Sequence, residues 1–162
     1  RKLTAHLDRG VLTLGSWLAA LPHLNELSIS CGGASPVTLA ASLSRLTTLT
    51  SLEVWDCYSV LPEGCLPTSL RSLALSIQHA GRPSLPAAVA AATGLEQLTV
   101  ESPLDDAEGL QRLQNLTSLT LATGEVGVPD QVEELTALRS LKVRTACSCA
   151  TLQGPAPLIS GC

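Results

Sequence analysis

The chain has 162 residues, which is the size of a single domain with a proper core. Hydrophobic residues make up 45% of it and aromatic residues only 2%, so the core must consist almost entirely of Leu, Val, Ile and Ala. This composition excludes a disordered chain, and its regular interruption by polar residues excludes a membrane span. The formal net charge is −4 and the ten basic residues are dispersed, which excludes the basic patch of a nucleic-acid-binding protein.

The two ends carry no feature of a complete gene product. The chain starts with Arg1 and contains no Met, so we expect residues 1–162 to be one domain of a longer protein. The apolar segment 11–24 is too short to span a bilayer and contains Pro22, so we do not interpret it as a targeting segment.

The six cysteines do not have the density of a disulfide-stabilised scaffold. Cys147 and Cys149 are one residue apart, which is poor spacing for zinc, and no His lies near any pair at ligand spacing. We therefore expect structural thiols in a reducing, cytoplasmic compartment, and we expect no metal. A disulfide framework remains the alternative, because the positions alone do not decide any pairing: Cys31, Cys57, Cys65, Cys147, Cys149 and Cys162.

An internal repeat organises the chain. The pattern Leu-x-x-Leu-x-(Leu/Ile/Val) starts at Leu24, Leu49, Leu70, Leu95, Leu116 and Leu138, at spacings of 25, 21, 25, 21 and 22 residues. Among 32 leucines a few matches arise by chance, but a regular phase at this period is typical of a stacked-repeat protein. Leu3 and Ala5 indicate a truncated copy before the first full one.

Each repeat predicts one short strand. The last two aliphatic residues of the pattern alternate with polar residues, which favours a strand with one buried face. The connections are too long for hairpins, so the strands should be parallel and each turn should be covered by its neighbours. The expected strands are 24–29, 49–54, 70–75, 95–100, 116–121 and 138–143.

The connections predict short helices and irregular segments. Pro86 and Pro129 should occupy the first helical position of two helices, and Asp105 or Asp106 should cap a third that carries Leu110 and Leu113 on one face. We also expect a helix-like segment in 37–46. Between Leu49 and Leu70, two prolines and a glycine predict an extended or 3₁₀ path.

The repeat resembles the leucine-rich repeat family over nearly the whole chain. Segments 85–100 and 128–143 look like the intracellular type found in plant and algal resistance-type receptors and in Ras-binding scaffolds. The resemblance implies an α/β leucine-rich-repeat solenoid with strands on the concave face and short helices on the convex face. The family's Asn or Cys after each strand is matched only by Cys57, so we expect its ladder of hydrogen bonds to be mostly missing.

Motifs for catalysis are missing from the sequence. There is no phosphate-binding loop, no Gly-x-Ser-x-Gly and no His-Glu-x-x-His, and the three histidines fall in separate repeats. The acidic cluster at 105–108 is better explained by helix capping than by a cation. Asn115-Leu116-Thr117 has the form of a glycosylation acceptor, but we interpret it as part of the repeat. We expect no enzyme activity, no cofactor and no membrane insertion.

The exposed side of the strands is the candidate binding surface. Alternation places small polar residues there, and the seven strands should span about 29 Å, which suits a peptide or one face of a small domain. Trp55 is the exception, and it is either a binding anchor or a ring lying over small neighbours. The acids near it and Lys142 with Arg144 at the far end predict a charge gradient, with Glu53 and Glu101 flanking Trp55 at one height on adjacent strands. The candidate partner-binding residues are Glu26, Ser28, Ser30, Ser51, Glu53, Trp55, Gln97, Thr99 and Glu101.

The preferred interpretation is a protein-recognition module of an intracellular receptor or adaptor. The alternative is a structural spacer without a dedicated partner, which the small side chains of the strand face favour. A GTPase-activating or hydrolytic module is the remote alternative, with Arg82 as its nearest candidate for a catalytic arginine.

Overall fold

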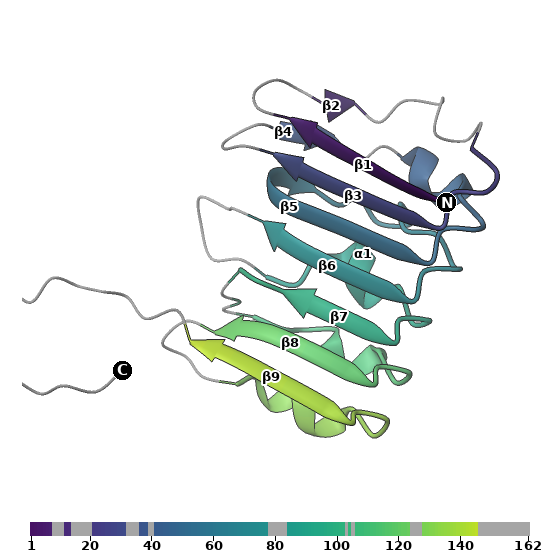
Figure 1. The fold of residues 1–162 in the computed structure, drawn as a ribbon. Coiled ribbons are helices and arrows are strands. Elements are labelled where there is room, and N and C mark those ends of the chain that lie inside the picture. Colours follow the sequence, from purple (N-terminus) through teal and green to yellow (C-terminus); the bar gives the residue numbers. More distant parts are fainter. Residues whose placement is uncertain are drawn as a thin grey trace, which may run out of the picture.

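Seven parallel strands form the main sheet of the protein. The computed structural model describes residues 1–7, 12–13, 21–31, 36–38, 41–77, 84–102, 104, 106–123 and 128–145. The strands follow each other in the sheet in chain order, as Figure 1 shows. They are β1 (Lys2–Leu7), β3 (Glu26–Cys31), β5 (Ser51–Val60), β6 (Ser72–Ile77), β7 (Gln97–Val100), β8 (Ser118–Thr123) and β9 (Ser140–Thr145). The prediction of one parallel strand per repeat is confirmed.

The aliphatic positions of the repeat form continuous buried rows behind the sheet. The second Leu of each pattern is at most 1% exposed in five successive strands: Leu27, Leu52, Leu73, Leu98 and Leu119. The third aliphatic position is equally continuous, at most 3% exposed: Ile29, Val54, Leu75, Val100 and Leu121. Strand pairing places the members of each row opposite one another, so each repeat covers the aliphatic side chains of the next.

In β9, the last described strand, the aliphatic rows are only partly covered by a neighbouring repeat. Leu141 and Val143 occupy the same two rows in β9, but they are 44% and 37% exposed. Within the described part of the chain, β9 has a strand on only one side.

The strands begin two residues later than the sequence predicts. The first Leu of each pattern lies in a turn, where its N–H donates to the carbonyl three residues earlier, as from Leu49 to Leu46 and from Leu116 to Leu113, both 3.0 Å. The following N–H groups bond to the preceding repeat and start the ladder of the sheet. The first Leu is buried in five of the six repeats and partly buried at Leu138, but it is not part of the strand.

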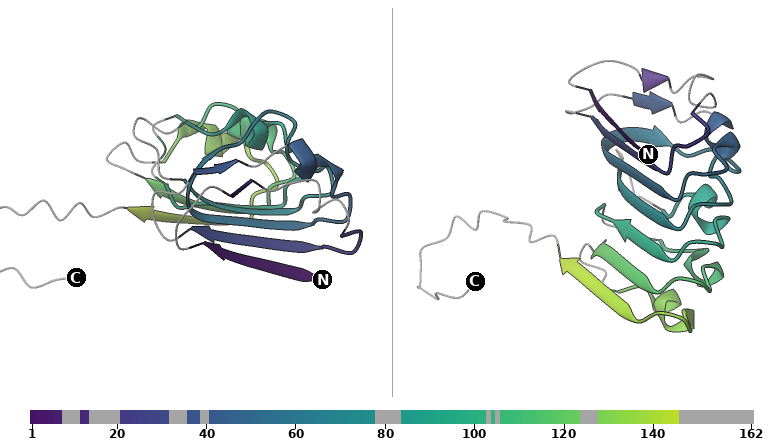
Figure 2. Two further views of the ribbon diagram at one scale, coloured as in Figure 1. Left: turned by 90° about the horizontal axis from the view of Figure 1, so that it is seen from above. Right: turned by 45° about the vertical axis from the view of Figure 1, so that its right-hand side comes forward.

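The convex connections contain less α-helix than predicted. The one α-helix of the described residues is the single turn α1 (Ala87–Ala90), and the others are 3₁₀ helices: η2 (Ala41–Arg45), η3 (Leu110–Arg112) and η4 (Asp130–Glu134). They lie on the opposite side of the sheet from its open face, as Figure 2 shows. Repeats of 21 to 25 residues, each of which includes a strand and a turn, leave room for only about one turn of helix, which favours the tighter 3₁₀ form.

The expected helix starts need correction. Pro86 and Pro129 are the N-cap residues of α1 and η4, one position before the first helical residue. Asp106 accepts a hydrogen bond from the N–H of Glu108 at 2.9 Å, so it closes a turn before η3, whose N-cap is Gly109. Asp105 lies outside the described residues. Leu110 and Leu113 are both fully buried, as their spacing predicted.

A second, smaller parallel sheet was not predicted. β4 (Pro36–Thr38) pairs with β2 (Leu12–Thr13) on one side and with the second half of β5 on the other. The expected helix-like segment 37–46 is therefore a strand at its start, where β-branched Val37 and Thr38 favour extended backbone. β5 reaches this sheet because its register shifts between Val54 and Cys57. The path from β5 to β6 contains no helix, as the prolines predicted.

Candidate functional site

The open side of the main sheet, which we call the strand face, carries the predicted rows of small polar side chains. Strand pairing aligns the first row as Lys2, Glu26, Ser51, Ser72, Gln97, Ser118 and Ser140, and the second row as Thr4, Ser28, Glu53, Ala74, Thr99, Thr120 and Lys142. All nine candidate binding residues lie on this face, and each of their side chains is partly or largely exposed. The alternation of the strands therefore located the surface correctly, whereas its use in binding stays a prediction.

Trp55 lies in the third row, at the point where β5 bends. It pairs in register with Ser30 of β3, which in turn pairs with His6 of β1. The Trp55 side chain is partly buried, although it is on the open side of the sheet. Trp55 lies within the register shift of β5 between Val54 and Cys57, and such irregularities re-aim side chains along a strand. The largest side chain of the strand face is thus held at a local bend.

The positions of two glutamates relative to Trp55 differ from the prediction. Glu53 is on the same strand as Trp55, in the second row, and its carboxylate accepts a hydrogen bond from the hydroxyl of Ser28 at 2.9 Å. Glu101 follows β7, two strands away. They therefore do not flank Trp55 at one height on adjacent strands. The prediction assumed that the strands carrying Trp55 and Glu101 are neighbours, whereas β6 lies between β5 and β7.

The expected charge gradient is also corrected, because most of its charges are paired. The guanidinium of Arg144 donates to the carboxylate of Glu101 at 2.8 Å, between residues that lie on either side of β8. The ammonium of Lys2 lies 3.7 Å from the carboxylate of Glu26 on the neighbouring strand. Both pairs are largely exposed, and such pairs contribute little to stability. These pairs neutralise Lys2 and Arg144, so Lys142 is the cation on the described strand face that has no paired carboxylate.

A polar ladder at the start of the strands was missed by the sequence analysis. In six successive places one backbone carbonyl accepts two N–H groups of the next repeat, over 2.8–3.2 Å: those of Arg1, Asn25, Thr50, Arg71, Glu96 and Thr117. The family's ladder was expected after each strand, and Cys57, its one match, has a side chain outside the described residues. The observed ladder lies at the other end of the strands.

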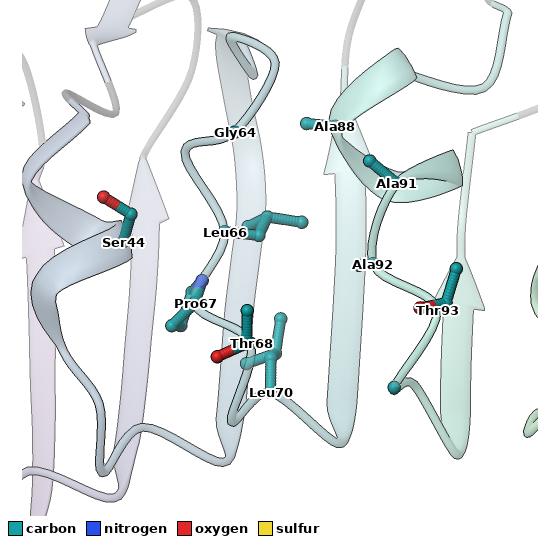
Figure 3. A pocket seen from close by; sticks show the side chains of 11 residues that line it. Ser44, Gly64, Leu66, Pro67, Thr68, Leu70, Ala88, Ala91, Ala92 and Thr93 are labelled. Atoms are coloured by element: carbon teal, nitrogen blue, oxygen red, sulfur yellow. The ribbon is translucent and has the colours of Figure 1, made fainter.

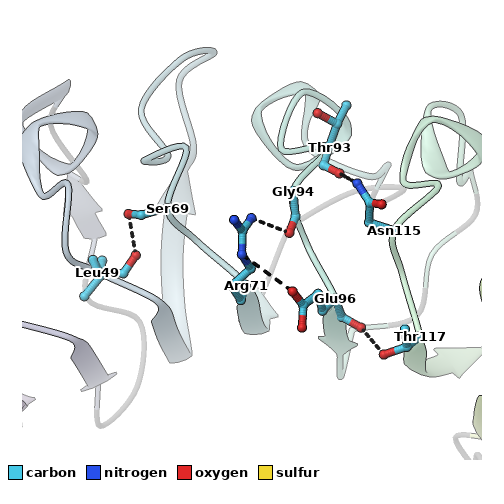
Figure 4. Close-up of polar contacts among 8 residues, drawn as sticks. All are labelled: Leu49, Ser69, Arg71, Thr93, Gly94, Glu96, Asn115 and Thr117. Atoms are coloured by element: carbon cyan, nitrogen blue, oxygen red, sulfur yellow. Dashed lines mark hydrogen bonds and ion pairs between the residues drawn. The ribbon is translucent and has the colours of Figure 1, made fainter.

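Side chains reinforce this ladder, as Figure 4 shows. Ser69 donates to the carbonyl of Leu49 at 2.7 Å, and Asn115 donates to that of Thr93 at 2.9 Å. Arg71 donates to the carbonyl of Gly94 at 2.9 Å. The amide of Asn115 thus bonds to the preceding repeat. The signal available in the sequence was the recurrence of Ser, Thr or Asn next to the first Leu in four of the six repeats.

A hollow of about 430 Å³ lies behind the sheet, between the path into β6 and the α1 segment, as Figure 3 shows. It exists because this path contains no helix, so α1 has no helical neighbour on that side. Leu66 points across it toward Ala88 and Ala91. Its described lining consists of hydroxyl groups and apolar side chains.

The described residues contain no group of three side chains that could hold a metal ion. Cys65 is a free thiol, fully buried, and burial raises its pKa, which makes it unreactive. A disulfide that includes Cys65 is therefore not formed. Arg82 and His79 lie outside the described residues. No helix within the described ranges is long and apolar enough to cross a membrane.

These features define a solenoid with one parallel strand per repeat. Among solved structures, the chain is similar to an internalin from Listeria monocytogenes, with a TM-score of 0.55 and 22% identity over 79% of this chain and 42% of the internalin. It also matches the plant peptide hormone receptor RGFR1 in complex with RGF2, with a TM-score of 0.41 and 15% identity over 88% of this chain and 34% of the receptor. No protein-family model and no curated protein sequence matches it.

The fold is therefore that of the leucine-rich-repeat proteins, as the repeat pattern predicted. The chain spans less than half the length of these two structures.

Proposed function

We propose that this protein is a recognition module that binds another protein through its strand face, as part of an intracellular receptor or adaptor. The observation that carries the proposal is Trp55, a partly exposed aromatic side chain on an otherwise small and polar surface. Tryptophan is enriched among the residues that dominate binding energy, because its rigid ring contributes a large contact area at little entropic cost.

The size of the strand face supports the same proposal. Seven strands at about 4.8 Å and six residues at about 3.3 Å give a surface of about 29 Å by 20 Å. This is somewhat smaller than the area of about 800 Å² that each partner of a typical complex contributes. The face therefore suits a peptide or part of a small domain.

The spacer alternative rests on the small Ser, Thr and Ala side chains that fill most of the three rows. A spacer needs a stable stack but no anchor, so removal of Trp55 would leave its interactions unchanged. One experiment therefore distinguishes the recognition module from the spacer.

The experiment is a comparison of the proteins captured from the native source by the wild-type chain and by Trp55→Ala. Val128→Ala is the matched control, because Val128 is 44% exposed and precedes η4 on the other side of the sheet. We expect Trp55→Ala to lose partners that Val128→Ala retains. Identical partner lists for all three proteins would favour the spacer.

The proposed compartment has a separate test. A free, buried Cys65 is compatible with a reducing environment. The number of reactive thiols should then be six when the protein is unfolded without a reductant. A count of four or fewer would place the protein outside the cytosol.

A further inference from the structure

Two charges on the strand face have no oppositely charged neighbour among the described residues. Glu53 on β5 accepts a hydrogen bond from Ser28, and no cationic group of the described residues lies within ion-pair distance of it. Within the described part of the chain, Lys142 on β9 likewise has no carboxylate at that distance. Both belong to the second row, so they mark the two sides of one continuous line across the sheet.

The second row between these two charges is made of small side chains. Ala74, Thr99 and Thr120 occupy the second row on the three intervening strands. Side chains of this size let the backbone of an extended ligand approach the sheet closely. Four strand spacings separate Glu53 from Lys142, which is about 19 Å, the length of about six extended residues.

Trp55 and Arg144 determine which ligand group binds at each end of the second row. Trp55 is two residues after Glu53 on the same side of β5, so a guanidinium bound to Glu53 can also lie against the indole ring. Arg144 is already paired with Glu101 at 2.8 Å, so Lys142 is the group left to bind an anion. The Glu53 end therefore favours arginine, and the Lys142 end favours a carboxylate.

From this arrangement, and resting on the proposed function, we infer that the strand face binds an extended peptide with an arginine and an acidic residue about six positions apart. The arginine lies on Glu53 and Trp55, and the acidic residue lies on Lys142. The peptide crosses β6, β7 and β8 between these two contacts.

The test is a selection of random dodecapeptides on the immobilised wild-type chain at low ionic strength. We expect enrichment of peptides with Arg and Asp or Glu five to seven positions apart. For a synthetic copy of one such peptide, Glu53→Gln and Lys142→Gln should each weaken binding about two- to fivefold, the range of exposed ion pairs. Glu133→Gln and Arg112→Gln are the charge-matched controls on η4 and η3, and they should leave binding unchanged.

A double-mutant cycle assigns each contact. Replacing the peptide's arginine should have a smaller effect on Glu53→Gln than on the wild type, and replacing its acidic residue should have a smaller effect on Lys142→Gln. Additive effects in both cycles would overturn the assignment.

The outcomes separate this inference from the proposed function. Peptides that depend on Trp55 but not on Glu53 or Lys142 would overturn the charge rule and leave recognition by the strand face standing. Peptides that depend on none of the three would contradict both. Failure to enrich any peptide would overturn the inference, while the comparison of captured proteins would still test recognition.

Discussion

The substitution Leu98→Ala tests whether the stacked aliphatic core stabilises the fold, at a position in β7 with strands on both sides. Leu98 is 1% exposed, and its neighbours in register, Leu73 and Leu119, are equally buried. Truncation of such a leucine removes buried methyl groups and leaves a cavity, at a cost of about 2–5 kcal/mol. The strands on both sides carry large side chains in the same row, so little relaxation into the cavity is expected.

Leu141→Ala is the matched control, because Leu141 occupies the same row but is 44% exposed. About half of the side chain remains in water before the change, so the expected cost is about 1 kcal/mol. The two substitutions are chemically identical and differ only in the cover that the neighbouring repeat provides.

Urea denaturation of the wild type and both variants measures the difference. With a slope of about 2 kcal/mol per M, the midpoint should fall by about 1–2.5 M for Leu98→Ala and by about 0.5 M for Leu141→Ala. An unchanged midpoint for Leu98→Ala, or equal shifts for the two variants, would refute the claim that neighbouring repeats bury Leu98 more fully than Leu141.

Two further predictions concern stability. Gly109 has φ +93°, and a Cβ there would lie 2.5 Å from that of Ala90, so Gly109→Ala should cost about 2–4 kcal/mol in chemical denaturation; Gly64→Ala, at φ +72° with nothing within 4 Å, should cost only about 1 kcal/mol, and equal costs would contradict the predicted clash. Burial raises the pKa of Cys65 above its ordinary value of 9.0, so the unfolded chain releases this proton first and the stability present below pH 9 falls as the pH rises above it. Cys65→Ala should show a weaker decline over that range, and parallel stability curves for the two proteins would contradict the assignment.

The rows of the sheet could be predicted because they depend on local alternation and a fixed period. Leu98 and Thr99 show this: one is buried and the other open, as their places in the pattern require. The resemblance to leucine-rich repeats supplied the same architecture, and strand pairing confirms it.

The features that were missed depend on contacts between repeats. Arg144 reaches Glu101, 43 residues away, across a strand whose intervening side chain is small, and no local pattern encodes this contact. The turn at Leu49 and the 3₁₀ form of η4 depend on how tightly each connection must close. The bend of β5 at Trp55 lies where this strand passes from one sheet to the other, which no local pattern reveals.

The most direct test of the central claim is the dissociation constant of one captured partner, measured by titration against the wild type, Trp55→Ala and Val128→Ala. If the strand face is the binding surface, Trp55→Ala should weaken binding by about 2 kcal/mol, roughly 30-fold, and Val128→Ala should not change it. Far-UV circular dichroism and the urea midpoint of Trp55→Ala serve as the folding control. Equal dissociation constants for a folded Trp55→Ala and the wild type would show that the strand face is not what this protein uses.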